Sequence, residues 1–279
     1  MYQRMISKAQ EIFENDIVVD SYTDNKGLIA NIRSYAVFDY LKAKLQGDKD
    51  DDGYAISADV LSATQFGAPQ KRMRFVVMGI RKDIADVVKL PEGKYKDGPY
   101  RTVEDAIKDL EDVEPVYNVS DDISGIKLQA KTGLSELALT LRDSEILHNH
   151  IITKTTPTAM ARFKALDQGQ NFHSLSEEMK TNTYTDVTRT QNTIYLRLKY
   201  DEPSGTVVNV RKSMWVHPTK DRAVSIREAA RLQTFPDSFV FCGTKDKQYQ
   251  QVGNAVPPIM AKAIAKKLAN QLNKALSQK

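Results

Sequence analysis

The fold is decided by the stretch Arg222-Ala-Val-Ser-Ile-Arg-Glu-Ala-Ala-Arg-Leu-Gln-Thr-Phe-Pro-Asp237, which resumes farther along the chain as Gln250-Gln-Val-Gly-Asn-Ala-Val-Pro-Pro258. Its first part predicts a helix that starts at Ser225, because the hydroxyl of Ser225 and the carboxylate of Glu228 have the spacing of a capping box. Pro236 pushes the residue before it out of the helical region, so the helix is expected to end there.

The second part of this stretch predicts a turn followed by another helix. Gly253-Asn254 suits a tight turn, and Pro257-Pro258 suits a helix start, where a missing amide hydrogen costs nothing. From there to the C-terminus, apolar residues recur every four positions: Ile264, Leu268, Leu272 and Leu276. Such a stripe must bury against something.

The composition indicates a soluble protein of a reducing compartment. The 279 residues are 41% hydrophobic and carry a net charge of +4, which is compatible with nucleic acid binding but does not argue for it. One cysteine excludes an internal disulfide, and no apolar run reaches the ~18 residues that a membrane span needs. We therefore expect a cytoplasmic protein with no membrane partner.

Two strands are predicted upstream, over Tyr54–Val60 and Gln70–Ile80. From Phe75 onward the second strand is apolar on both faces, as in a buried strand of a helix-covered sheet. Side chains two apart share a face of a strand, so three polar side chains are expected to project together at its start: Gln70, Arg72 and Arg74. A guanidinium can hold a phosphate bidentately and an amide offers both donor and acceptor, although a merely basic strand end is the alternative.

Signals between residues 83 and 219 are local. Thr102 and Asp105 mark a helix start, and Pro157–Leu166 predicts another helix. His148-Asn-His150 suggests a metal site, but the only cysteine is distant and no acidic residue stands at ligand spacing. We therefore expect these histidines to make structural hydrogen bonds, and we expect no metal.

A hairpin is predicted from the alternation of Thr193–Leu198 and Thr206–Val210 around a turn. Arg211-Lys212 at its end either contact phosphate or simply lie on the surface. Trp215 is expected in the core, because a lone tryptophan more often anchors packing than stacks on a ligand.

Three segments resemble, in this order, motifs of the DNA cytosine-5 methyltransferase family: Gly67–Arg74, Arg227–Asp237 and Gln251–Pro258. Leu147–His150 and Arg197–Thr206 also resemble its variable region, although glycine stands where the family usually has a proline before the threonine. Three independent motifs in the right order make a chance match very improbable.

The resemblance implies DNA contacts at the end of the sheet that carries Gln70, Arg72 and Arg74. Arg74 would polarise the ring carbonyl of a flipped cytosine, supported by Gln70, and Arg72 would hold the neighbouring DNA backbone, which helps to offset the cost of extruding the base. The segment 83–220 would contain the part that reads double-stranded DNA in the major groove.

The resemblance also implies a cofactor site. Asn254, Ala255 and Val256 would contact S-adenosylmethionine, whose carboxylate suits amides at a helix N-terminus. The helix over residues 225–234 would brace the recognition domain, and its arginines are expected to be mainly structural.

Other features of the family are absent from the sequence. The family attacks cytosine with the cysteine of a Pro-Cys pair, whereas Cys242 lies between Phe241 and Gly243, which is the wrong context. The Phe-x-Gly-x-Gly cofactor loop is missing, and the Glu-Asn-Val triplet has only the echo Glu14-Asn15-Asp16. We therefore expect a complementary N-terminal methyltransferase subunit, no activity of this chain alone, and an exposed apolar stripe on the last helix.

The expected fold class is α/β: the C-terminal remainder of a class I, Rossmann-like methyltransferase sheet plus a smaller target-recognition domain. Residues 1–98 would form the incomplete catalytic portion, 99–220 the recognition domain, and 221–279 the bracing helix, the cofactor-side turn and a returning helix. The implied function is a component of an enzyme that methylates C5 of cytosine in a specific DNA sequence. A catalytically silent, sequence-specific DNA-binding module and part of an RNA cytosine-5 methyltransferase are the alternatives.

Overall fold

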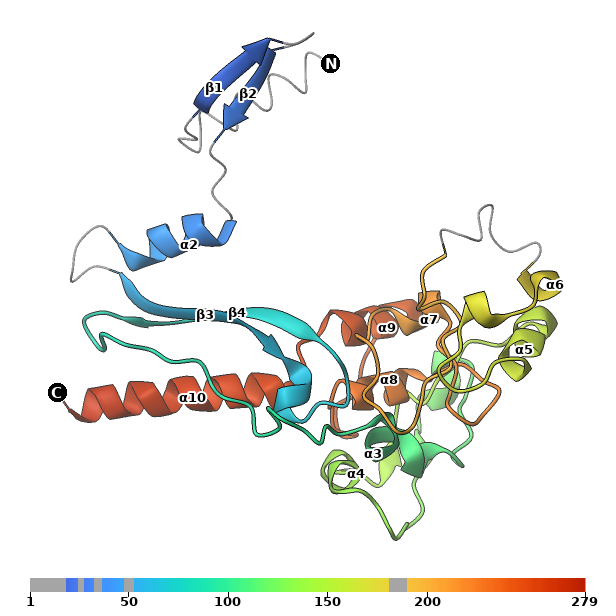
Figure 1. Ribbon diagram of the computed structural model, residues 1–279. Helices are drawn as coiled ribbons and strands as arrows, with labels where there is room; N and C mark the ends of the chain where they lie inside the picture. The colour runs from blue at the N-terminus through green and yellow to red at the C-terminus, as the bar shows by residue number, and fades with distance from the viewer. Residues whose placement is uncertain (1–18, 25–27, 33–36, 48–52, 181–189, 279) are drawn as a thin grey trace. The chain divides into compact units, whose positions relative to one another are not determined.

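The computed structural model describes residues 19–24, 28–32, 37–47, 53–180 and 190–278 (Figure 1). The chain divides into two compact units. The first contains the described residues up to 57 together with 78–89 and 272–278, and the second contains 58–77 and the described residues of 90–271. The domain boundaries predicted at residues 98 and 220 both lie within the second unit, and they stay predictions. Among the described residues, no helix is both long and apolar enough to cross a membrane.

The first unit begins with an antiparallel strand pair and a helix. β1 (Val19–Asp24) pairs with β2 (Leu28–Ile32), and α2 (Val37–Gln46) follows them. The echo Glu14-Asn15-Asp16 of a catalytic triplet lies outside the described residues.

The two strands predicted upstream of the motifs are present as a two-stranded sheet. β3 (Tyr54–Ser62) pairs with β4 (Met73–Arg81), and the predicted turn between them contains the 3-10 helix η1 (Ala63–Phe66). The turn closes at Gly67, whose φ of 93° is in the left-handed region that glycine adopts without a Cβ penalty.

The second strand starts three residues later than predicted, at Met73 rather than Gln70. The backbone before it bonds to a distant loop instead, since the amide of Lys71 donates to the carbonyl of Ser204 (2.7 Å) and the amide of Ser204 donates to Pro69 (2.9 Å). Gln70, Arg72 and Arg74 therefore do not share one strand face, and that prediction is wrong.

The expectation that β4 is buried on both faces is also wrong for this chain. In the second unit, Phe75 is 52% exposed and Val77 41%, whereas Val76 on the alternate face packs against a core cluster. β4 pairs with β3 alone among the described residues, and its face that bears Met73, Phe75 and Val77 stays accessible.

The long C-terminal helix α10 (Pro258–Ser277) is present and starts at the predicted proline. In the second unit its first turns join Leu61 and Phe66 in a core cluster, with Met260 fully buried and Ile264 packed against it. The expectation that the whole stripe lies exposed is therefore wrong at Ile264. It holds at the far end, where Leu276 is 51% exposed.

The main core of the second unit surrounds α8 (Ile226–Leu232), in which every residue is buried. α3 (Val103–Ile107) contacts both α8 and α4 (Glu136–Leu141), and α9 (Lys245–Asn254) packs on α8. Both predicted helix starts are confirmed as capping boxes, Thr102 with Asp105 and Ser225 with Glu228. Trp215 is fully buried in this core, as predicted.

The rest of the second unit is built from short elements: β5 (Ile126–Lys127) paired with β6 (Ile146–Leu147), α5 (Pro157–Lys164), α6 (Glu177–Lys180) and α7 (Val210–Ser213). The predicted hairpin over residues 193–210 is wrong. Its first arm bonds instead to the segment after α7, with the amide of Leu198 donating to Val216 (3.1 Å) and the amide of Val216 donating to Leu196 (2.9 Å).

Candidate functional site

The segments that carry the three motifs meet in one buried polar network centred on Gln70, which is fully buried. Its amide nitrogen donates to the carbonyl of Leu232 (3.1 Å) and to the side-chain oxygen of Gln233 (2.7 Å). Its amide oxygen accepts the backbone N–H of Val207 (3.1 Å). One side chain thus ties the start of β4 to the end of α8 and to the loop before α7.

Arg72 extends this network toward α9. Its guanidinium donates to the carbonyls of Val207 (2.8 Å) and Gly253 (3.0 Å), and the residue is 1% exposed. Burial, with the nearby charge of Arg74, lowers the pKa of Arg72 to about 10. Both described contacts of Arg72 are with backbone carbonyls, so the structure uses it as an internal brace and not as the free DNA-backbone contact predicted from the sequence.

Gln233 completes the connection between α8 and α9. Its amide nitrogen donates to the carbonyl of Val252 (2.7 Å), one residue before Gly253. Gly253 lies inside α9, so the predicted tight turn at this position is wrong. Glycine is needed there for a different reason: a Cβ would lie 2.7 Å from the backbone carbon of Val208. Close helix–loop packing, rather than turn geometry, explains this glycine.

The arginines of α8 are structural, as predicted. Arg231 is fully buried and binds two carboxylates, Asp237 (2.9 and 2.5 Å) and Asp109 (2.5 Å). Arg227 donates to the carbonyls of His148 (2.7 Å), Pro236 (2.9 Å) and Phe239 (2.8 Å) and to the side chain of Asn149 (3.1 Å). These bonds hold the loops on both sides of α8 in place.

His148 and His150, which were expected to make structural hydrogen bonds, do so. His148 Nδ1 lies 3.1 Å from the carbonyl of Asp122, and His150 bridges the carbonyl of Val113 (2.9 Å) and the hydroxyl of Ser225 (2.9 Å). No group of His, Cys, Asp and Glu that could hold a metal ion occurs among the described residues.

A second buried charge cluster forms around Glu228, which accepts two hydrogen bonds from the guanidinium of Arg222 (2.7 and 2.8 Å). Although burial opposes its charge, Arg222 holds the pKa of Glu228 well below its usual range. His217 Nδ1 accepts backbone N–H groups from Thr219 (3.3 Å) and Lys220 (3.2 Å), so its neutral form carries the proton on Nε2. Burial lowers the pKa of His217 to about 4.

The predicted cofactor residues lie at the junction of α9 and α10. Asn254 and Val256 are exposed and Ala255 is half-buried, so all three can reach a ligand. The first amides of α10 are already occupied, however: Ile259 donates to the hydroxyl of Thr234 (3.2 Å), and Met260 donates to Pro257 (3.0 Å). A carboxylate at this junction would therefore be held by groups other than these two amides, and the cofactor contacts of Asn254, Ala255 and Val256 stay predictions.

Arg74 lies apart from this network and is half-buried. Its guanidinium donates to the carbonyl of Met73 (2.7 Å), a neighbour on the same strand. Of the three polar residues predicted at the strand start, it is the one that is not committed to the buried network. Cys242 is exposed and forms no disulfide.

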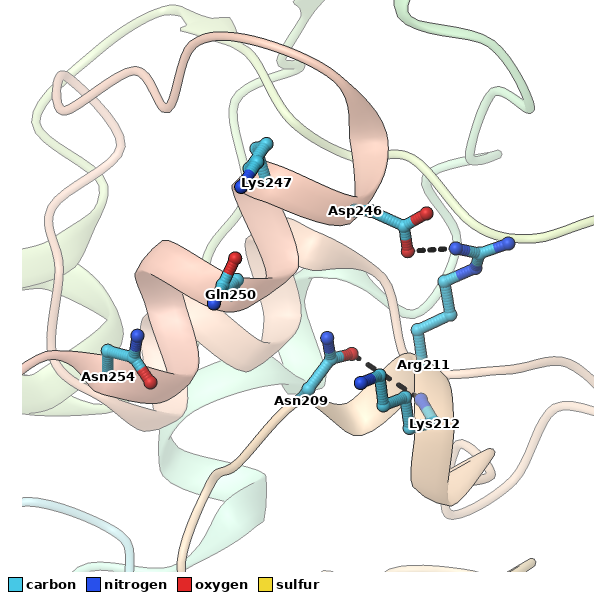
Figure 2. A pocket seen from close by; sticks show the side chains of 7 residues that line it. All are labelled: Asn209, Arg211, Lys212, Asp246, Lys247, Gln250 and Asn254. Carbon is cyan, nitrogen blue, oxygen red and sulfur yellow. Dashed lines mark hydrogen bonds and ion pairs between the residues drawn. The ribbon is translucent and has the colours of Figure 1, made fainter.

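Asn254 also lines a hollow of about 660 Å3 along one side of α9 (Figure 2). The other lining residues come from α9 and from the segment that enters α7: Asn209, Arg211, Lys212, Asp246, Lys247 and Gln250. Arg211 forms an ion pair with Asp246. Apart from Asn254, and from Arg211-Lys212 as one alternative, none of these residues is predicted from the sequence. Thr244, which caps α9 through its hydroxyl, is the signal that could have located this helix.

Comparison with known proteins agrees with the resemblance to cytosine-5 methyltransferases. The family of C-5 cytosine-specific DNA methylases matches residues 31–270. The type II methyltransferase M.DdeI of Desulfomicrobium norvegicum is 28% identical over 82% of this chain and 58% of its own length. The type II methyltransferase M1.HphI of Haemophilus parahaemolyticus is 32% identical over 76% of this chain and 47% of its own length.

A solved structure supports the same assignment at the level of the fold. A crystal structure described as a DNA modification methyltransferase encoded within a prophage (E. coli) superposes with a TM-score of 0.62 at 26% identity, covering 79% of this chain and 61% of that one. The chain spans about half the length of the curated relatives that it matches. The chain belongs to the C-5 cytosine-specific DNA methylase family.

Proposed function

We propose that this chain is the recognition and cofactor-side component of a DNA (cytosine-5) methyltransferase, which transfers a methyl group from S-adenosylmethionine to C5 of cytosine in a specific DNA sequence. The buried network of Gln70, Arg72 and Gln233 carries the proposal. It fixes the base of the strand that bears Arg74 relative to the helix end that bears Asn254. A reaction between two bound molecules requires such fixed spacing of their binding groups.

Within this proposal each predicted residue has a defined task. Arg74 contacts the target cytosine or the DNA beside it. Asn254, Ala255 and Val256 contact the cofactor, which supplies the methyl group as a sulfonium. Gln70 and Arg72 act through the backbone as positioning residues. Residues 99–220 form the recognition domain, although they share a core with α8.

A complementary N-terminal half would supply the cysteine nucleophile. Attack on cytosine needs a thiolate in an activating site, and Cys242 is exposed and outside a Pro-Cys pair. Val60 (49%), Met73 (55%) and Val77 (41%) of the β3–β4 pair are exposed apolar side chains, which are suited to packing against further parts of a methyltransferase sheet.

Co-expression followed by bisulfite sequencing of the host DNA tests this function. The partner is a polypeptide that carries Pro-Cys, Phe-x-Gly-x-Gly and Glu-Asn-Val, encoded next to this chain. Protected cytosines in one sequence context are expected only when both polypeptides are present, and they should vanish when the partner's Pro-Cys cysteine is changed to serine.

Two other outcomes distinguish the alternatives. Tight, sequence-specific DNA binding without methylation in every combination would favour a silent DNA-binding module. Methylation of cellular RNA with unmodified DNA would favour the RNA enzyme.

A further inference from the structure

The hollow along α9, which Asn254 also lines, is basic. Arg211, Lys212 and Lys247 line it, and the single acidic residue in the lining, Asp246, is already paired with Arg211. Lys245 precedes Asp246 on α9 but does not line the hollow, because its ammonium group donates to the carbonyls of Tyr117 (2.9 Å) and Ile152 (3.3 Å). The lining therefore carries three cationic side chains and one carboxylate.

Stability does not explain this arrangement of charges. Lys247 occupies the first turn of α9, where the helix dipole is positive and a cation costs about 0.3–1 kcal/mol. Lys212 is exposed and its side chain lines the hollow (Figure 2). The side chain of Asn209 caps its backbone N–H (3.4 Å).

The proposed cofactor does not suit this charge either. S-adenosylmethionine carries a sulfonium, an ammonium and one carboxylate, so its net charge is positive, and like charges repel in a partly enclosed site. The chemistry of the lining fits an anion. Ammonium and guanidinium groups bind phosphate oxygens, and amide side chains such as those of Asn209 and Gln250 add neutral donors.

The shape of the hollow fits a run of phosphates rather than a single one. Lys247, Gln250 and Asn254 follow one another at three and four residues along one face of α9, which covers about 10 Å of helix. Neighbouring phosphates of one DNA strand lie farther apart than the ~3.4 Å axial rise per step, because the backbone winds around the duplex, and this length accommodates two of them. The opposite wall of the hollow begins at Asn209, two residues after Val207. The backbone of Val207 is bonded to both Gln70 and Arg72.

We infer that the hollow between α7 and α9 binds consecutive backbone phosphates of one DNA strand through Lys212, Lys247 and Arg211. This inference rests on the proposed function and adds a binding surface outside the strand-end arginines. The contacts are independent of base sequence, so they position the duplex while other residues read it.

Binding of the full chain to a fluorescently labelled 30-base-pair duplex, followed by anisotropy from 50 to 200 mM salt, tests the inference. Each lost phosphate contact is expected to reduce the slope of log K against log salt by about 0.9 and the affinity at 0.1 M salt by about eightfold. Lys212→Gln/Lys247→Gln should thus lose about 1.8 in slope and up to about 60-fold in affinity. Lys262→Gln, an exposed lysine on α10, is the matched control and should match wild type.

The outcomes separate this inference from the proposed function. If wild type binds the duplex and the double variant binds it with the same slope, the inference is overturned while the proposed function stands. If the double variant loses affinity for S-adenosylmethionine in calorimetry but keeps its DNA slope, the hollow is a cofactor site and the inference is also overturned. If wild type fails to bind the duplex at 50 mM salt, both are contradicted.

Discussion

Replacing Gln70 with leucine should destabilise the protein more than most single changes, because one side chain makes three buried hydrogen bonds. The substitution removes the donor to Leu232 and Gln233 and the acceptor of the Val207 N–H. An unsatisfied buried polar group costs about 1–3 kcal/mol, which gives about 3–9 kcal/mol for three groups before relaxation. The apolar area that leucine buries returns about 2 kcal/mol. The difference is an expected net loss of about 1–7 kcal/mol in the free energy of unfolding.

Urea denaturation monitored by the fluorescence of the buried Trp215 measures this loss directly. Gln251→Leu is the matched substitution, because Gln251 is exposed and donates a single bond to the carbonyl of Cys242 (3.0 Å). It should change the free energy of unfolding by less than about 0.5 kcal/mol. A Gln70→Leu protein as stable as the Gln251→Leu protein would refute the view that this network holds the motifs together.

Three further substitutions test other buried contacts of the second unit. Arg231→Met removes both hydrogen bonds to the buried carboxylate of Asp237 and leaves Asp109 with Arg142 alone, so urea denaturation should show a loss of about 3–5 kcal/mol; a loss below about 1 kcal/mol would contradict the bracing role. Gly253→Ala drives a Cβ into the backbone of Val208 and should cost about 1–3 kcal/mol, whereas Gly205→Ala, whose nearest neighbour would be 4.0 Å away, should be nearly neutral. The pKa of His217 is lowered to about 4 from an unfolded value of about 6.5. Its contribution to the free energy of unfolding is therefore complete above about pH 6.5 and is lost as pH falls toward about 4. The free energy of unfolding should fall in this window by up to about 1.4 kcal/mol per pH unit. His217→Asn should flatten this part of the pH profile, and an unchanged slope would count against the assignment.

Predictions from the sequence are correct where they depend on residues close together in the chain or on a family motif. Both capping boxes could be predicted, because a cap depends on residues three positions apart. Trp215 was placed in the core and the α8 arginines were given a structural role, and both predictions are confirmed. The order of the three motifs was sufficient to identify the family.

Predictions failed where a long-range contact decides the conformation. Gln70 reads as the start of a strand, yet hydrogen bonds to Ser204 divert the backbone at this point. The segment 193–198 alternates like a hairpin arm, but its backbone bonds to the region after α7. Gly253 resembles a turn residue, although it serves helix–loop packing. None of these partners lies within the sequence window on which such predictions depend.

The basic hollow was missed for a related reason. Its walls come from residues 209–212 and 246–254, and neither segment alone shows more than ordinary surface charge. The fold brings the two segments together, because the bonds of Arg72 and Gln70 to Val207 anchor one wall and the bond of Arg72 to Gly253 anchors the other.

Transfer of a labelled methyl group from S-adenosylmethionine to DNA tests the central claim most directly. The purified chain, its complementary half and an equimolar mixture would be assayed on the same duplex DNA. Label on C5 of cytosine is expected in the mixture alone, and it should be lost with Arg74→Ala. Incorporation by this chain alone, or no incorporation by a mixture that forms a stable complex on DNA, would contradict it.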